Sequence, residues 1–274
     1  MHHGAKSISH AIDVHTPSVA RMYDWLLGGV ENYRSDRKAC AELLEIAPST
    51  QVLARNNRAF LRRVVRVMAQ EYRIRQFLDH GSGLPTQDNV HQIAQGIDAA
   101  SRVVYIDNDP IVLAHGRTTL AANDRTAVIN ADMRDTEAIF AHPDVQRLID
   151  LTQPVAALFV SVLHCLPDTG DDNDPDALVK RVAGRLPPGS LLVLCHLVSD
   201  KPSVREKVTA LMQRSTHGNW GRVREQREVA AYFAGMRIIP PGLTDVVDWR
   251  PDTPPPPVER RATDWVEWGG VAQL

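Results

Sequence analysis

The residues best suited to chemistry in this chain are residues 79–83, which read Asp-His-Gly-Ser-Gly after the apolar pair Phe77-Leu78. Glycine permits a positive φ and lets a ligand approach the backbone with no Cβ in the way. A helix-like pattern begins near Asn89. A buried strand, a tight turn and a helix in this order are typical of nucleotide sites, where helix amide groups face the ligand.

Carboxylates also end two later apolar runs. Residues 103–107 are a β-branched run that ends in Asp107, and residues 126–133 carry Asp132 near the end of a third run. An acidic residue at the end of the second strand of such a fold accepts hydrogen bonds from ribose hydroxyls. Because ligands bind beyond the carboxyl ends of parallel strands, we expect Asp79, Asp107 and Asp132 to lie at one site.

The elements that position these groups follow from the apolar pattern. Three helices are predicted first, beginning near Thr16, Asn32 and Gln51, and the five arginines of the third are expected on its solvated face. Strands and helices then alternate, which is typical of an α/β fold with a parallel sheet. The predicted strands are residues 76–79, 102–107, 126–130, 155–160, 190–196, 236–239, 244–249 and 265–272. The predicted helices between them are residues 89–96, 110–122, 135–141, 175–185, 203–212 and 226–234.

The composition limits the function classes. The chain has 274 residues, 43% of them hydrophobic and 23% charged, which suits one enlarged globular α/β domain. The net charge of −2 gives no electrostatic case for a nucleic-acid partner, although a local basic groove from Arg58, Arg62, Arg63 and Arg66 stays open. No apolar run approaches the ~20 residues that cross a bilayer. No metal-ligand spacing is present, and three scattered cysteines favour the reducing cytoplasm.

Several motifs together resemble the class I S-adenosylmethionine (SAM) dependent methyltransferases. They resemble more closely the actinobacterial S-adenosyl methyltransferase family, formerly described as a domain of unknown function. The resemblance covers nearly the whole chain from about Pro17, and it is carried by residues 17–24, 26–29, 32–33, 57–63, 81–86, 104–110 and 241–243.

The resemblance implies a Rossmann-like, seven-stranded, mostly parallel sheet with one antiparallel strand near the C-terminus and an N-terminal helical lid. The implied organisation is a flexible arm at residues 1–16, a helical cover at 17–73 and a SAM-binding core at 74–274. It also implies that Gly81, Ser82 and Gly83 face the methionyl and ribose parts of SAM, that Asp107 binds the ribose, and that Asp132 and Met133 border the adenine.

Further cofactor contacts are predicted around this centre. Asp79 is expected near the amino group of the cofactor, and Arg21 near its carboxylate, because a guanidinium matches carboxylate geometry. His80 stands where the family motif usually carries an apolar residue, so it is expected either to tilt toward the site or to weaken binding. The remaining predicted contacts are Tyr23, Asn32, Asn108 and Ser161.

Methyl transfer is an in-line displacement at an activated carbon, so positioning supplies much of the catalysis and no catalytic triad is required. His164, after the fourth strand, is the predicted general base, and His196 is a weaker candidate. The alternative for each is a neutral packing role. Trp220, Trp249, Trp265 and Trp268 are expected either to line an acceptor pocket or to pack in the core.

The predicted function is transfer of a methyl group from SAM, leaving S-adenosylhomocysteine (SAH), to oxygen or nitrogen of a small-molecule acceptor in secondary metabolism. The main alternative is a non-catalytic SAM-binding regulatory protein. A nicotinamide oxidoreductase fits less well, because Gly83 is followed by Leu84-Pro85-Thr86 and no G-x-G-x-x-G motif results.

Overall fold

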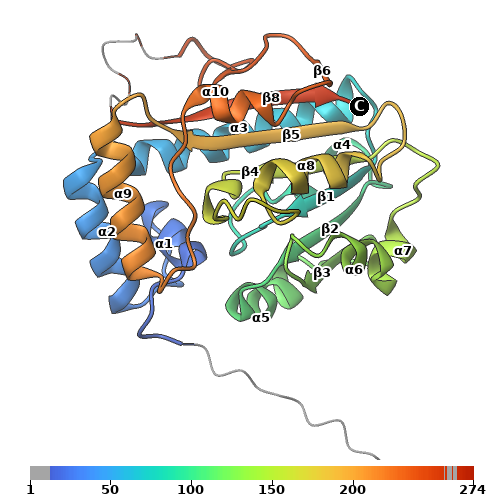
Figure 1. The fold of residues 1–274 in the computed structure, drawn as a ribbon. Helices are drawn as coiled ribbons and strands as arrows, with labels where there is room; N and C mark the ends of the chain where they lie inside the picture. The colour runs from blue at the N-terminus through green and yellow to red at the C-terminus, as the bar shows by residue number, and fades with distance from the viewer. Residues whose placement is uncertain (1–12, 256, 258–260, 262–263) are drawn as a thin grey trace, which may run out of the picture.

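The computed structural model describes residues 13–274 except 256, 258–260 and 262–263. The described residues form one sheet of eight strands in the order β3-β2-β1-β4-β5-β8-β6, with β7 also pairing with β8 (Figure 1). Neighbouring strands from β3 to β5 are parallel, and β8 runs antiparallel to β5. The strand bounds are β1 Gln76–His80, β2 Arg102–Asp107, β3 Thr126–Asn130, β4 Ala156–Val160, β5 Leu191–Val198, β6 Arg237–Ile238, β7 Thr244–Asp245 and β8 Val266–Gln273.

The predicted α/β fold with a mostly parallel sheet is confirmed, including the antiparallel strand near the C-terminus. All eight residues of β5 are buried, as expected for a strand with elements on both faces of the sheet. Successive side chains of each strand point to opposite faces of the sheet. Phe77 and Val103 belong to one apolar cluster, and Leu78 and Val104 to another.

Helices cover both faces of this sheet (Figure 1). On one face, α3 and α4 pack over Phe77 and Val103, and on the other face α6, α7, α8 and α10 pack over Leu78 and Val104. The helix bounds in this part are α3 Thr50–Gln70, α4 Val90–Ile97, α5 Pro110–Thr119, α6 Thr136–Ala141, α7 Pro143–Leu148, α8 Pro175–Ala183 and α10 Gln226–Ala231. Helix α7 was not predicted from the sequence. It begins at Pro143 and is capped by His142, whose side chain accepts a hydrogen bond from the Asp144 amide.

A third apolar cluster lies beyond the ends of the strands and joins α1 (Val19–Leu26), α2 (Arg34–Ile46) and α9 (Pro202–Ser215). Helices α2 and α9 lie side by side at one end of the molecule (Figure 1). The cover predicted at residues 17–73 therefore differs from the structure in two ways. Only the first turns of α3, through Leu53 and Ala54, belong to the third cluster, whereas residues 60–69 pack on the sheet. Helix α9 joins the cover from the other end of the sequence.

One arginine of α3 is not on the solvated face that the sequence predicted. Arg63 is only 6% exposed, and its guanidinium donates hydrogen bonds to the carbonyl oxygens of Trp249, at 3.0 Å, and Val246, at 2.5 Å. Among its neighbours, Arg62 pairs with Asp88 and Arg66 with Asp252. These contacts use α3 arginines to fix the neighbouring loops.

The predicted arm at residues 1–16 lies mostly outside the described residues, which begin at Asp13. There, the Asp13 carboxylate accepts hydrogen bonds from the amides of His15 and Thr16, so this end of the segment forms a turn before α1. Among the described residues, no helix is both long and apolar enough to cross a membrane.

Candidate functional site

A cavity of about 690 Å³ lies at the carboxyl edge of the sheet, between the strand ends and the helical cover. Segments that follow β1, β2, β3 and β4 form one part of its wall. The rest comes from the segment before α1, from α1, α2 and α3, from the end of β5 and from the C-terminal region. Most of the predicted site residues border it: Arg21, Tyr23, Gly81, Ser82, Gly83, Asp107, Asn108, Asp132, Met133, Ser161 and His164. The parallel topology has brought together residues that are far apart in the sequence.

The turn after β1 depends on its two glycines. Gly81 has φ +68° and Gly83 has φ +66°, values that residues with a side chain seldom adopt. A Cβ on Gly81 would overlap the side chain of Val162, whereas a Cβ on Gly83 would meet no atom within 4 Å. Gly81 is therefore required for packing, and Gly83 leaves open space at the turn.

This difference predicts unequal stability losses. Gly81→Ala is expected to lower the free energy of unfolding by about 2 to 4 kcal/mol, because steric overlap adds to the cost of a positive φ. Gly83→Ala is the matched control, with an expected loss of about 1 kcal/mol from its φ alone. Urea unfolding of both variants measures the difference, and equal losses would contradict the packing role of Gly81.

Asp107 connects the second strand to the glycine turn. Its two carboxylate oxygens accept hydrogen bonds from the amides of Gly83, at 2.8 Å, and Asp109, at 2.9 Å. Burial raises the pKa of Asp107 to about 6, while these two amides favour its ionised form. Beside it, the buried Ser82 hydroxyl has no hydrogen-bond partner in the described part of the chain. The cavity therefore offers an oriented carboxylate and a free hydroxyl to a ligand.

The segment after β3 forms another part of the wall. Ala131, Asp132 and Met133 border the cavity, and Asn108 with Pro110 does so after β2. Asp132 forms an ion pair with Arg134 at 2.5 Å, which lowers its pKa. Asp132 is thus a charged group whose orientation is fixed by its neighbour.

The cover is fastened to the cavity edge by Asp36 and Ser18. Fully buried Asp36 accepts hydrogen bonds from Arg21 Nε and from the Ser18 amide, both at 2.9 Å. The Ser18 hydroxyl donates to Asp109, the residue that caps α5. Arg21 borders the cavity, but its ion pair with Asp36 already uses part of the guanidinium that was predicted to bind the cofactor carboxylate.

His164 stands in the wall beside two aromatic rings. It is 2% exposed, its ring lies 4.8 Å from that of Trp220, and its Nδ1 has no hydrogen-bond partner among the described residues. Burial, and then the charge of Arg224, lower its pKa to about 3. A histidine with so low a pKa is neutral near pH 7 and a weak proton acceptor, which favours the alternative role of a neutral wall residue over that of a general base.

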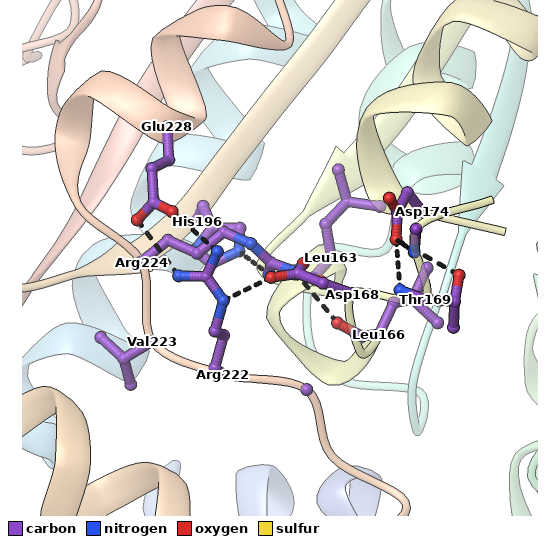
Figure 2. A network of polar contacts seen from close by, with 12 residues as sticks. Leu163, Leu166, Asp168, Thr169, Asp174, His196, Arg222, Val223, Arg224 and Glu228 are labelled. Carbon is purple, nitrogen blue, oxygen red and sulfur yellow. Dashed lines mark hydrogen bonds and ion pairs between the residues drawn. The ribbon is translucent and has the colours of Figure 1, made fainter. Parts of the chain in front are cut away.

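Figure 2 shows how Arg224 holds the loop that carries His164. The side chain of Arg224 is 1% exposed and donates to the carbonyl oxygens of Leu163 and Leu166, to His196 Nε2 and to Asp168. Arg222 pairs with the same Asp168 and with Glu228. Two arginines from the segment before α10 thus fix the loop after β4.

Two predicted histidines lie outside the cavity wall defined by the described residues. His196 is fully buried, its Nδ1 donates to the Leu197 carbonyl oxygen, and its Nε2 accepts from Arg224. Both ring nitrogens are occupied, so His196 is not placed to take a proton from a ligand. His80 is fully buried in the sheet, with its ring stacked 4.4 Å from that of Phe159, so it does not tilt toward the site.

Two predicted polar contacts are also displaced from the described wall. Asp79 is buried in the sheet opposite Tyr105, where burial raises its pKa to about 7. Asn32 donates hydrogen bonds to the Asp24 carboxylate, at 2.9 Å, and to the Gly29 carbonyl oxygen, at 3.0 Å. Asn32 therefore stabilises the turn after α1.

Several wall residues were not identified from the sequence. Glu267 borders the cavity from β8, although it lies in an alternating strand that gave no signal of a site. Asn57 borders it from α3 and donates to the Tyr23 hydroxyl at 3.0 Å. Trp220 and Trp265 are in the wall, as the acceptor-pocket alternative required, whereas Trp249 packs against Phe60 in the core.

The order of the strands, with one antiparallel strand beside β5, is that of the class I methyltransferase fold. A model of the S-adenosyl methyltransferase family matches residues 5–274, and the chain belongs to this family. Its methyl donor is SAM. A search of the curated proteins found no match.

The solved structures that resemble this chain over nearly its whole length include the following two proteins. One is a protein from Thermobifida fusca YX that has been assigned as a methyltransferase; it is 36% identical, covers 98% of this chain and 99% of its own, and has a TM-score of 0.87. The other is a DUF574 family protein from Streptomyces avermitilis MA-4680, 34% identical over 96% of this chain and 99% of its own, also with a TM-score of 0.87. The trans-methyltransferase CalH, solved with SAH, shares the fold at 15% identity and a TM-score of 0.50, over 92% of this chain and 68% of its own.

The residues present fit SAM. The nucleoside needs an acceptor for its ribose hydroxyls, and the ionised Asp107 supplies one at the second strand. The backbone at Gly83 carries no side chain and leaves space, and the buried Ser82 hydroxyl is free to bond a polar group. Among the described residues there is no group of three or more His, Cys, Asp or Glu side chains that could hold a metal ion.

Proposed function

We propose that this methyltransferase transfers the methyl group of SAM to oxygen or nitrogen of a small-molecule acceptor. The observation that carries the proposal is the division of one cavity into two unlike parts. The part at β1, β2 and β3 presents Ser82, Asp107 and Asp132, and the part under the cover carries a group of apolar side chains beside polar ones such as Tyr23 and Asn57. Its apolar wall consists of Met22, Leu26, Leu43, Leu53, Leu197, Met212, Trp220 and Trp265.

In this proposal the polar part holds the cofactor. Gly81, Ser82 and Gly83 border the methionyl and ribose portions, Asp107 accepts the ribose hydroxyls, and Asp132 with Met133 borders the adenine. When bound, SAM supplies a methyl group on a positively charged sulfur. The residues of this chain bind and orient the two substrates and exclude water, which are the main requirements of an in-line displacement.

The apolar part receives the acceptor. Its aliphatic and indole side chains favour an apolar body, and neutral His164 with its unpartnered Nδ1 offers a hydrogen-bonding ring nitrogen to a polar substituent. The free thiols of Cys40, Cys165 and Cys195 support the cytoplasm as the proposed compartment.

Two measurements test the proposal. Calorimetry is expected to detect SAM and SAH binding at micromolar concentrations, and incubation with methyl-labelled SAM and a bacterial metabolite extract is expected to move label to small molecules. If neither SAM nor SAH bound, the proposal would fail. Tight binding without any label transfer would instead support a regulatory SAM-binding protein.

A further inference from the structure

Glu267 is a buried carboxyl group that the function described above does not use. It lies on β8 opposite Leu197 of β5, is 3% exposed and borders the cavity. Its Oε1 accepts a hydrogen bond from the Ser161 hydroxyl. Its buried Oε2 has no hydrogen-bond partner in the described part of the chain. The Cys195 thiol, a weak donor, also interacts with this carboxyl group. One oxygen is therefore held by Ser161, and Oε2 is without a strong donor.

The partner of Glu267 is itself fixed in an unusual conformation. Ser161, directly after β4, has φ +57°, which is uncommon for a residue with a side chain, and its amide donates to the Cys195 carbonyl oxygen at 3.1 Å. Strained residues of this kind persist where the surrounding structure holds them, often at functional sites. Here the strained residue directs its hydroxyl to Glu267.

The groups around Glu267 leave its charge uncompensated. No ion pair among the described residues involves it, and the groups that influence its ionisation are Ser161, Cys195 on β5 and Asp245 on β7. Burial first, and Glu267 among the neighbouring charges, also raise the pKa values of the Tyr23 hydroxyl on α1 and the Cys165 thiol after β4, so both stay neutral beside it. Burial first, and the neighbouring Asp245, raise the pKa of Glu267 to about 7. Burial and the charge of Glu267 also raise the pKa of the Cys195 thiol, so that thiol stays neutral. A buried carboxylate without a counter-ion is costly, and a cationic ligand would offset that cost.

The surroundings indicate the shape of that ligand. Leu197, Trp220 and Trp265 border the same cavity, and Ser161 places Glu267 beside the end of β4. A carboxylate among aliphatic and indole side chains is suited to an ammonium group on an apolar body.

We infer that Glu267 binds the amino group of the acceptor and takes its proton, so that the acceptor of this enzyme is an amine. This inference rests on the proposed function. The acceptor ammonium gives one proton to the Glu267 carboxylate. The nitrogen lone pair then forms a bond to the methyl carbon while the carbon–sulfur bond breaks and its electron pair stays on sulfur. The products are SAH and a methylated ammonium, and the carboxyl proton leaves to solvent.

The test uses sinefungin, a SAM analogue in which an amino group on carbon replaces the S-methyl group. Calorimetry compares sinefungin, SAM and SAH on the wild type, Glu267→Gln and Glu267→Asp at pH 6 and pH 8.5. Asp245→Asn is the matched control, because it removes a neighbouring carboxylate that does not border the described cavity. Thermal melts establish that each variant is folded.

In the wild type, sinefungin affinity relative to SAH is expected to rise from pH 6 to pH 8.5, because Glu267 ionises in this range while the sinefungin amine stays protonated. Glu267→Gln is expected to weaken sinefungin at pH 8.5 by about 30-fold or more, since it leaves the ammonium unpaired. SAH affinity is expected to stay unchanged, and Glu267→Asp and Asp245→Asn are expected to keep most of the sinefungin affinity.

Three results would overturn the inference. The first is equal sinefungin affinity in the wild type and Glu267→Gln. The second is an equal weakening of SAM and sinefungin by Glu267→Gln, which would make Glu267 a counter-ion of the sulfonium. The third is a loss of SAH affinity in Glu267→Gln, which would place Glu267 in the donor site. Failure of the wild type to bind SAH would instead overturn the proposed function itself.

Discussion

Asp107→Ala is expected to weaken SAM binding about 100-fold, which corresponds to about 2.7 kcal/mol at 25 °C. The proposed ribose contacts are hydrogen bonds to a charged acceptor, and such bonds contribute about 1.5 to 3 kcal/mol each. The substitution also leaves the amides of Gly83 and Asp109 without their acceptor, so the turn itself loses a fixed geometry. Both effects are expected to weaken binding of the cofactor and to leave binding of the methyl-accepting substrate unchanged.

Calorimetric titration with SAH measures this effect without any knowledge of the acceptor. Asp107→Asn keeps the size of the side chain and is expected to retain part of the affinity. Asp135→Asn is the control, because Asp135 caps α6 and lies outside the described cavity wall. A change of less than threefold in Asp107→Ala would exclude Asp107 as a ribose-binding residue.

Arg224→Met is expected to lower the free energy of unfolding by about 3 kcal/mol. The change leaves the carbonyl oxygens of Leu163 and Leu166 and the ring nitrogen of His196 without their buried donor. The ion pair with Asp168 contributes less than a fully buried pair, because the Asp168 side chain is 43% exposed. The loop that carries His164 loses most of its support, so acceptor binding is expected to weaken as well.

Urea unfolding measures the loss, and Arg222→Met is the matched control. Arg222 pairs with the same Asp168, but its side chain is 38% exposed, so its removal is expected to cost at most about 1 kcal/mol. If the two variants were equally stable, the buried contacts of Arg224 would not be what holds the loop.

The sequence predicted the elements that depend on local pattern. Strands β1 to β5 follow from short apolar runs that are buried on both faces, and their order along the chain indicated the α/β fold. Asp107 and the glycine turn were found because each stands next to the end of such a run. The prediction that Arg63 lies on the solvated face of α3 was wrong. Its charge indicated exposure, but the loop carbonyl oxygens that accept its hydrogen bonds come from a distant part of the sequence.

The site under the cover depended on contacts between distant segments. Glu267 reaches Ser161 across β5, and α9 packs on α2, although neither pairing has a signature in the local sequence. His80 and His196 looked like functional side chains because histidine is common at active sites. In the structure, the ring of His80 stacks on that of Phe159. Both ring nitrogens of His196 are hydrogen-bonded, one to Leu197 and one to Arg224.

The family, the α/β fold and the residues beside the donor could be predicted from the sequence alone, because strand-end residues of a parallel sheet share one edge. The side chains proposed to contact the methyl acceptor could be identified only in the folded chain. The carboxyl of Glu267, the neutral His164 and the arginine contacts that hold its loop exist only once β8, the loop after β4 and the segment before α10 are packed together. Burial then sets the charge of these side chains, and burial is a property of the folded chain.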